Sequence, residues 1–155
     1  MKNAVFSLLF CAMFVAASFA DEFMYPDSKL TPGSVDASAT TETLCAITQF
    51  KAINAVDPAM EAEVFKRYEM NPKRWPCPCE VDHFIPLELG GSGDLDNLWP
   101  QPYHTDVGAR MKDSVEKRLH RELCAGSVSL ERAQEIIKDD WYACYLKLND
   151  GDLCQ

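Results

Sequence analysis

The chain has 155 residues, which is enough for one domain with one hydrophobic core. Hydrophobic residues make up 47% of it and charged residues 25%, and these values exclude disorder along its whole length. The formal net charge of -9 excludes a broadly basic surface, so any binding of nucleic acid has to depend on a local basic element.

The first twenty residues have the pattern of a cleavable secretory signal. Lys2 provides a positive charge, residues 4–17 are apolar, and Ser18 and Ala20 are small residues at the positions that a signal peptidase reads. The apolar run is shorter than the roughly 20 residues of a membrane span, and an uncleaved anchor is the alternative. We expect cleavage after Ala20 and a secreted or periplasmic protein without a membrane segment.

The cysteines indicate a disulfide-bonded domain. One of the seven, Cys11, lies in the signal, and an even number remains in the exported chain. Six cysteines allow 15 pairings, and the residues alone do not choose among them. The motif Cys77-Pro78-Cys79 looks like half of a zinc site, but no second Cys or His pair stands at the usual spacing.

The exported chain is predicted to begin with an exposed, extended lead-in at residues 21–42, followed by one domain at residues 43–155. A short helix is expected at residues 44–54, where it carries Cys45 to the core. The sequence Asp57-Pro58 starts a helix that runs to about residue 68, with Asp at the N-cap and Pro at the first helical position.

The second half of the chain is predicted to contain two short strands and then two helices. Residues 80–85 alternate between polar and apolar as a half-buried strand does, and residues 90–93 form a flexible glycine-rich loop. Residues 97–99 form a short extended segment that stops at the next proline. Helices are predicted at residues 109–123 and 130–146 from their apolar spacing. The fold class is therefore a small α+β domain, mostly helical and stapled by disulfides.

The chemistry-bearing residues are Asp82 and His83 on the first strand and Asn97 before the second. Histidine can deprotonate a water near neutral pH, and an aspartate oxygen suits a divalent cation, so the pair fits phosphodiester hydrolysis. Neighbours on a strand point to opposite faces, so the two side chains reach one site only if the backbone bends locally.

The sequence around these residues contains the run Asp82-His83-Phe84-Ile85-Pro86-Leu87, the pair Gly90-Gly91, and Asp94-Leu95-Asp96-Asn97-Leu98. This pattern resembles the HNH family of nucleases, also called His-Me finger or ββα-metal nucleases. It is similar in particular to a group of small exported bacterial proteins that share Asn97 to Tyr103, Gly108 to Asp113 and the Leu-Cys pair at 123–124. The resemblance covers about residues 31–145.

The resemblance implies a role for each matching residue. His83 would be the general base, Asn97 would hold that histidine in place, and Asp82 would bind a divalent metal such as Mg²⁺, Mn²⁺, Ni²⁺ or Zn²⁺. His104 is the candidate for a further metal ligand, although it stands a little early in the sequence. Asp106, Lys112 and Asp113 are other candidates, and the related group places Lys112 at or near this position.

The resemblance also implies a Cys45–Cys124 disulfide and nucleic acid as the partner. DNA is the expected substrate and RNA the alternative. The predicted helix at 109–123 is the basic element of an acidic chain, and Arg110 and Lys112 are its candidates for phosphate contact. Ion pairs within the helix are the other explanation for those charges.

Two functions follow as hypotheses. The first is a secreted, metal-dependent HNH-type endonuclease of low sequence specificity. The second is an exported binding or structural module that keeps the same scaffold without catalysis. A third, metal binding by the cysteines, requires free thiols, which oxidation in an exported protein would remove.

Overall fold

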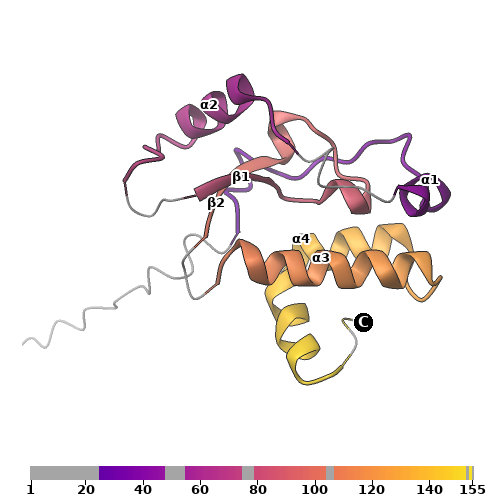
Figure 1. Cartoon of the computed structure of the whole chain (residues 1–155). Helices are drawn as coiled ribbons and strands as arrows, with labels where there is room; N and C mark the ends of the chain where they lie inside the picture. Colours follow the sequence, from indigo (N-terminus) through magenta and orange to yellow (C-terminus); the bar gives the residue numbers. More distant parts are fainter. Residues whose placement is uncertain (1–24, 48–54, 75–78, 104–106, 153, 155) are drawn as a thin grey trace, which may run out of the picture.

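A computed structural model describes residues 25–47, 55–74, 79–103, 107–152 and 154. In chain order, the described elements are helices α1 (Thr41–Ala46) and α2 (Pro58–Arg67), strand β1 (Cys79–His83), the 3₁₀ turns η3 (Leu87–Leu89) and η4 (Leu95–Asn97), strand β2 (Leu98–Pro102), and helices α3 (Ala109–Cys124) and α4 (Leu130–Asn149). The antiparallel β1–β2 hairpin lies between α2 on one side and α3 and α4 on the other (Figure 1). The predicted α+β class is confirmed, and the signal at residues 1–20 lies outside the described residues.

Two of the three longer helices, α2 and α4, begin at the side-chain caps that the sequence predicts. Asp57 caps α2 by accepting a hydrogen bond from the Ala59 amide at 2.8 Å, and Ser129 caps α4 by accepting one from the Arg132 amide at 3.1 Å. After α3, Gly126 has a φ of 73°, a left-handed conformation that favours glycine. Helix α1 starts at Thr41, three residues before the predicted position.

Helix α4 is longer than predicted and bends at Asp140. The backbone of Asp140 is extended, with φ −165° and ψ 72°. Its carboxylate accepts hydrogen bonds from the Ala143 amide and from the Tyr25 hydroxyl, both within 2.9 Å. Asp140 therefore acts as an N-cap inside the helix, where the second half starts in a new direction.

Strand β2 continues through Pro100 to Pro102, and the prediction that it stops at Pro100 is wrong. The register pairs Asp82 with Trp99 and His83 with Leu98. The two prolines are separated by one residue, so their nitrogens face the same edge of the strand. A proline is tolerated there because the sheet has two strands and the outer edge of β2 needs no hydrogen-bond donor.

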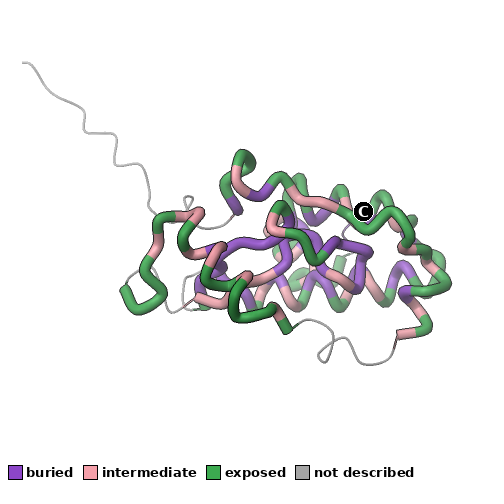
Figure 2. Tube along the Cα trace, turned by 90° about the horizontal axis from the view of Figure 1, so that it is seen from above, coloured by how far each residue is buried: buried purple, intermediate pink, exposed green. Residues whose placement is uncertain are grey.

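In the glycine-rich loop between the strands, residues 90–92 are buried and Gly93 is exposed. Gly90 has a φ of 73° and Gly91 approaches the end of β1 so closely that a Cβ on it would lie 1.8 Å from the Ile85 carbonyl oxygen. Figure 2 shows a buried path running through the middle of the molecule between exposed helix surfaces. The first three residues of the predicted flexible loop are thus packed against the end of β1.

The lead-in packs onto the domain in the part that the structure describes. The hydroxyl of Thr31 donates to the Leu98 carbonyl at 2.7 Å and lies 2.7 Å from the Tyr68 hydroxyl. Val35 forms an isolated β-bridge with Gly91. Residues 25–40 therefore join α2 to the hairpin instead of forming a separate extended arm.

The hydrophobic core lies where α3 and α4 meet the hairpin. Its largest fully buried members are Trp99 from β2 and Trp141 from α4, and the predicted apolar stripe of α3 supplies Val115, Leu119 and Leu123. No helix in the described ranges is long and apolar enough to cross a membrane.

Two disulfides staple the described part of the chain. Cys45 of α1 is bonded to Cys124 at the end of α3, which confirms the pairing implied by the resemblance, and Cys144 is bonded to Cys154. Cys79 is also disulfide-bonded, so it offers no thiolate to zinc. Disulfides fit an extracellular protein, because thiols oxidise in such compartments.

Candidate functional site

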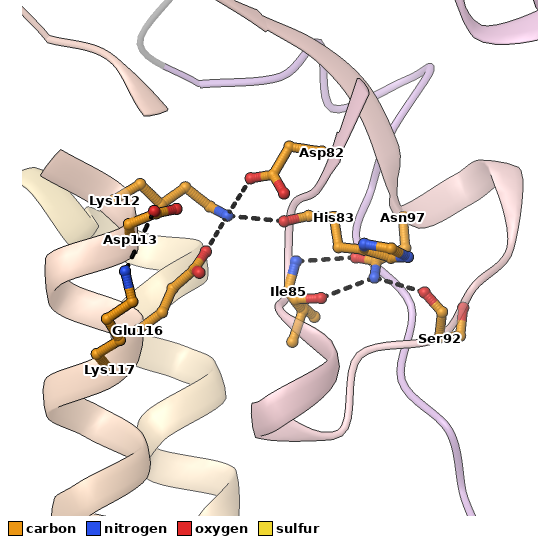
Figure 3. Close-up of polar contacts among 9 residues, drawn as sticks. All are labelled: Asp82, His83, Ile85, Ser92, Asn97, Lys112, Asp113, Glu116 and Lys117. Carbon is orange, nitrogen blue, oxygen red and sulfur yellow. Dashed lines mark hydrogen bonds and ion pairs between the residues drawn. The ribbon is translucent and has the colours of Figure 1, made fainter. Parts of the chain in front are cut away.

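The predicted site residues meet at the end of β1. His83 is the last residue of that strand, and Asn97 stands directly before β2. Figure 3 shows the Asp82 carboxylate on the α3 side of the strand and the His83 imidazole on the side away from Lys112. Asp82 and His83 therefore point to opposite faces, as alternation along a strand requires.

The His83 side chain is largely enclosed, and only 6% of the residue is exposed. Burial lowers its pKa, the Asp82 carboxylate raises it and the Lys112 charge lowers it again, with a net fall below the ordinary value. Within the described ranges, no protein group hydrogen-bonds the imidazole. His83 is therefore neutral at pH 7 and has a nitrogen lone pair available to accept a proton.

Asn97 holds the backbone around His83 and does not hold its ring. Its Oδ1 accepts from the Ile85 amide at 2.9 Å, while its Nδ2 donates to the carbonyls of Ile85 at 2.8 Å and Ser92 at 2.7 Å. Both amide hydrogens are used, and the residue is fully buried. The Phe84 amide also donates to the Asn97 carbonyl, so Asn97 holds both residues that directly follow His83 at the end of β1.

On the other face of the strand lies a buried cluster centred on Lys112, in the first turn of α3. Its Nζ lies 2.8 Å from Asp82 Oδ2 and 2.7 Å from the His83 carbonyl oxygen, and it also contacts Glu116 Oε1 (Figure 3). The Lys112 side chain has no exposed surface. All three ammonium hydrogens therefore have a partner.

The charges of this cluster balance when one carboxyl keeps its proton. Burial lowers the pKa of Lys112, but Asp82 and Glu116 outweigh that effect and raise it above its ordinary value. Burial, opposed by Lys112, raises the pKa of Glu116 to about 8. Lys112 and Asp82 thus form the ion pair at neutral pH, and Glu116 is the group that retains a proton.

A further carboxyl lies on the same face of the hairpin. Burial and repulsion from Asp82 raise the pKa of Glu80, while a hydrogen bond from Tyr103 lowers it. The charges of Asp113 and Lys112 also act on it, so this face has more carboxyl groups than cations.

The predicted phosphate contacts need one correction. Lys112 was expected to contact nucleic acid, but its buried ammonium is fully engaged by protein oxygens and does not reach the solvent. Arg110 is exposed and remains available at the start of α3. Lys117 and Arg118 pair with Asp113 and Glu122 one turn away, as the ion-pair alternative predicted.

Of the two predicted metal ligands, only Asp82 is among the described residues. His104 lies outside the described residues, and the Asp82 carboxylate is paired with Lys112. Elsewhere, ligand atoms of Cys45, His120 and Cys124 lie within 4.8 Å of one another and could hold a metal ion. The disulfide between those two cysteines removes both thiolates, so that group needs reduction before it can bind a metal.

Two residues of the site were missed by sequence reasoning. Glu116 follows Lys112 by four positions, a spacing that places two side chains on one helix face, and this signal was available. The second is Gly91, and the glycine pair in the sequence did not by itself indicate that Gly91 approaches Ile85 so closely.

Comparisons with protein-family models, with curated proteins and with solved structures find no match. The assignment of a function therefore depends on the residues and their geometry.

Proposed function

We propose that this protein is an exported phosphodiesterase of the HNH type, an endonuclease that cleaves DNA with little sequence specificity and accepts RNA as an alternative substrate. The observation that carries the proposal is the position of His83. It ends β1, burial lowers the pKa of its imidazole, and Asn97 holds the backbone of the residues that follow it. The motif from Asp82 to Leu98 supports the same assignment.

The chemistry requires a base, an attacking water and a leaving oxygen. A ring nitrogen of His83 takes a proton from water, the water oxygen forms a bond to phosphorus, and the bond from phosphorus to the leaving oxygen breaks. The leaving oxygen then takes up a proton. Arg110, exposed at the start of α3, is the candidate for contact with the substrate phosphates.

The resemblance implies a divalent metal, either Mg²⁺, Mn²⁺, Ni²⁺ or Zn²⁺, with Asp82 as a ligand. The donor set around Asp82 does not fit such an ion, because the ammonium of Lys112 already lies 2.8 Å from that carboxylate. We therefore route no step of the reaction through a metal at this position.

The test is plasmid cleavage by the oxidised, exported protein, with each metal and with EDTA, beside His83→Ala. We expect His83→Ala to lower the rate by about 10²–10⁴-fold, the usual contribution of a general base. His120→Ala is the matched control, because His120 lies next to Cys124 at the far end of α3, and it should leave the rate unchanged. Equal cleavage by all three proteins would contradict the assignment.

The dependence of cleavage on pH provides a second test. Because the pKa of His83 lies below its ordinary value, the rate should rise with pH and level off below pH 6.5. An acid limb centred above pH 6.5 would assign the base to another group.

A non-catalytic binding module is the second candidate. The observation in its favour is that Asp82 is neutralised by a buried lysine while His83 is only 6% exposed. Intact plasmid under every condition, with a folded protein, would favour this candidate over the enzyme.

A further inference from the structure

The oxygens around Lys112 form the kind of cage that proteins build for a hard divalent cation. Two carboxyl groups and one backbone carbonyl converge on a single point between the end of β1 and the first turn of α3 (Figure 3). Carboxylate and carbonyl oxygens are the ligands that Mg²⁺ and Ca²⁺ take in proteins. Here the point of convergence holds the Nζ atom of Lys112.

The ammonium group of Lys112 contacts all three of these oxygens. Its three hydrogens face the three oxygens, and the Lys112 side chain has no exposed surface. The Asp82 and Glu116 side chains are only 26% and 9% exposed, so the cage opens to water mainly at Asp82. A metal ion could enter only by displacing an amine that is tethered to α3.

We propose that Lys112 is the built-in cation of this site. Its ammonium takes the place of a divalent ion by joining Asp82, Glu116 and the His83 carbonyl. It thereby excludes such an ion from Asp82. The consequence for catalysis rests on the proposed function: cleavage with His83 as base needs no divalent ion at Asp82.

The position of Lys112 gives it a role in placing His83. Its bond to the His83 carbonyl ties the last residue of β1 to α3, while the side chain of Asn97 ties the following residues to the loop. Lys112 is therefore a positioning residue, because it acts on the backbone of the base and is not free to touch substrate. A divalent ion in the same cage could bind the same carbonyl, but it would dissociate in the presence of a chelator.

The first experiment measures Mn²⁺ binding by calorimetry and by electron paramagnetic resonance. The proteins are the wild type, Asp82→Asn, Lys112→Met and the double variant Lys112→Met/Asp82→Asn. If the wild type binds Mn²⁺ at all, we expect Asp82→Asn to bind it with the same affinity. Lys112→Met should bind Mn²⁺ at least tenfold more tightly than the wild type, and the double variant should lose that gain.

Lys117→Met is the matched control, because Lys117 lies on the same helix with an exposed side chain and pairs with Asp113. It should leave Mn²⁺ binding as in the wild type. If Lys112→Met does not fold, the comparison of the wild type with Asp82→Asn still decides. Mn²⁺ binding by the wild type that Asp82→Asn abolishes would overturn the inference.

The second experiment measures plasmid cleavage by the wild type after treatment with EDTA. Cleavage that persists in EDTA and is lost in His83→Ala supports the built-in cation. Cleavage that stops in EDTA, returns with Mg²⁺ and is absent from Asp82→Asn overturns the inference and leaves the proposed nuclease standing. Absence of cleavage in every condition counts against the proposed function, and Mn²⁺ binding then decides the inference by itself.

Discussion

Replacing Lys112 with methionine is the most informative change to the stability of this protein. Methionine keeps most of the length of the side chain but removes the charge and all three hydrogen bonds. Asp82 and Glu116 then lack their cation, and the His83 carbonyl lacks its donor. The variant therefore tests whether the buried cluster holds the hairpin against α3.

The expected cost can be worked from the contacts. Removing one partner of a buried ion pair costs about 3–5 kcal/mol, because the remaining charge is left without compensation. Water can reach Asp82, which is 26% exposed, and Glu116 can keep its proton, and both effects reduce the cost. The unpaired His83 carbonyl adds about 1–3 kcal/mol. We expect a loss of about 4 kcal/mol out of a total of about 5–15 kcal/mol.

Urea unfolding of the oxidised protein measures this loss, with the fluorescence of the buried Trp99 and Trp141 as the signal. Lys117→Met, whose side chain is 60% exposed, is the control and should cost less than about 0.5 kcal/mol. Adding Asp82→Asn to Lys112→Met should recover at least about 1 kcal/mol relative to additivity. A loss below about 1 kcal/mol for Lys112→Met, or strict additivity, would refute the reasoning.

Substitutions at three further positions test the rest of the site. Gly91→Ala places a Cβ against the Ile85 carbonyl oxygen and should lower the free energy of unfolding by about 3 kcal/mol in the same urea assay. Gly93→Ala is the control, because Gly93 has open space around it, and it should cost less than about 1 kcal/mol. Asn97→Ala leaves three buried backbone groups without a partner and should lower the free energy of unfolding by about 3 kcal/mol or more. An equally large loss is expected for Asn97→Asp, because its carboxylate would face two carbonyl oxygens. The pKa of Glu116 is higher in the folded state, at about 8, than its ordinary value of 4.5, so the unfolded chain loses that proton first and stability falls as pH rises through this window. Glu116→Gln should reduce this fall in the free energy of unfolding by about 1 kcal/mol or more between pH 5 and pH 8. Urea titrations at several pH values measure it. The same dependence of stability on pH in the wild type and in Glu116→Gln would reject the assignment of the proton to Glu116.

Much of the fold could be predicted because its signals are local. Asp57 and Ser129 cap their helices, and the four-residue apolar spacing of α3 identifies the buried stripe. The extension of β2 through its prolines could not be predicted in this way. It depends on the absence of a third strand beside that edge in the described structure, and no residue of β2 itself carries this information.

In the candidate site, too, some features could be predicted from the sequence and others could not. The sequence indicates His83 and Asn97 by their motif. Asn97 was expected to hold His83 in place, and its side chain bonds the backbone of Ile85 and Ser92 and not the imidazole. Those bonds depend on how the loop between the strands folds back on itself. The amide group of Asn97 has the same chemistry in either role, so the sequence cannot separate them.

By itself, the sequence determined where α2, α3 and α4 begin, the oxidised state expected of the cysteines and the group of residues around His83. Each of these follows from interactions between near neighbours or from composition. Only the tertiary structure decided that Lys112 is an internal cation instead of a phosphate contact. The sequence pattern of a lysine on a helix face is the same in either case. The role of Lys112 depends on Asp82, which lies thirty positions away in the chain and which the hairpin places 2.8 Å from the lysine ammonium.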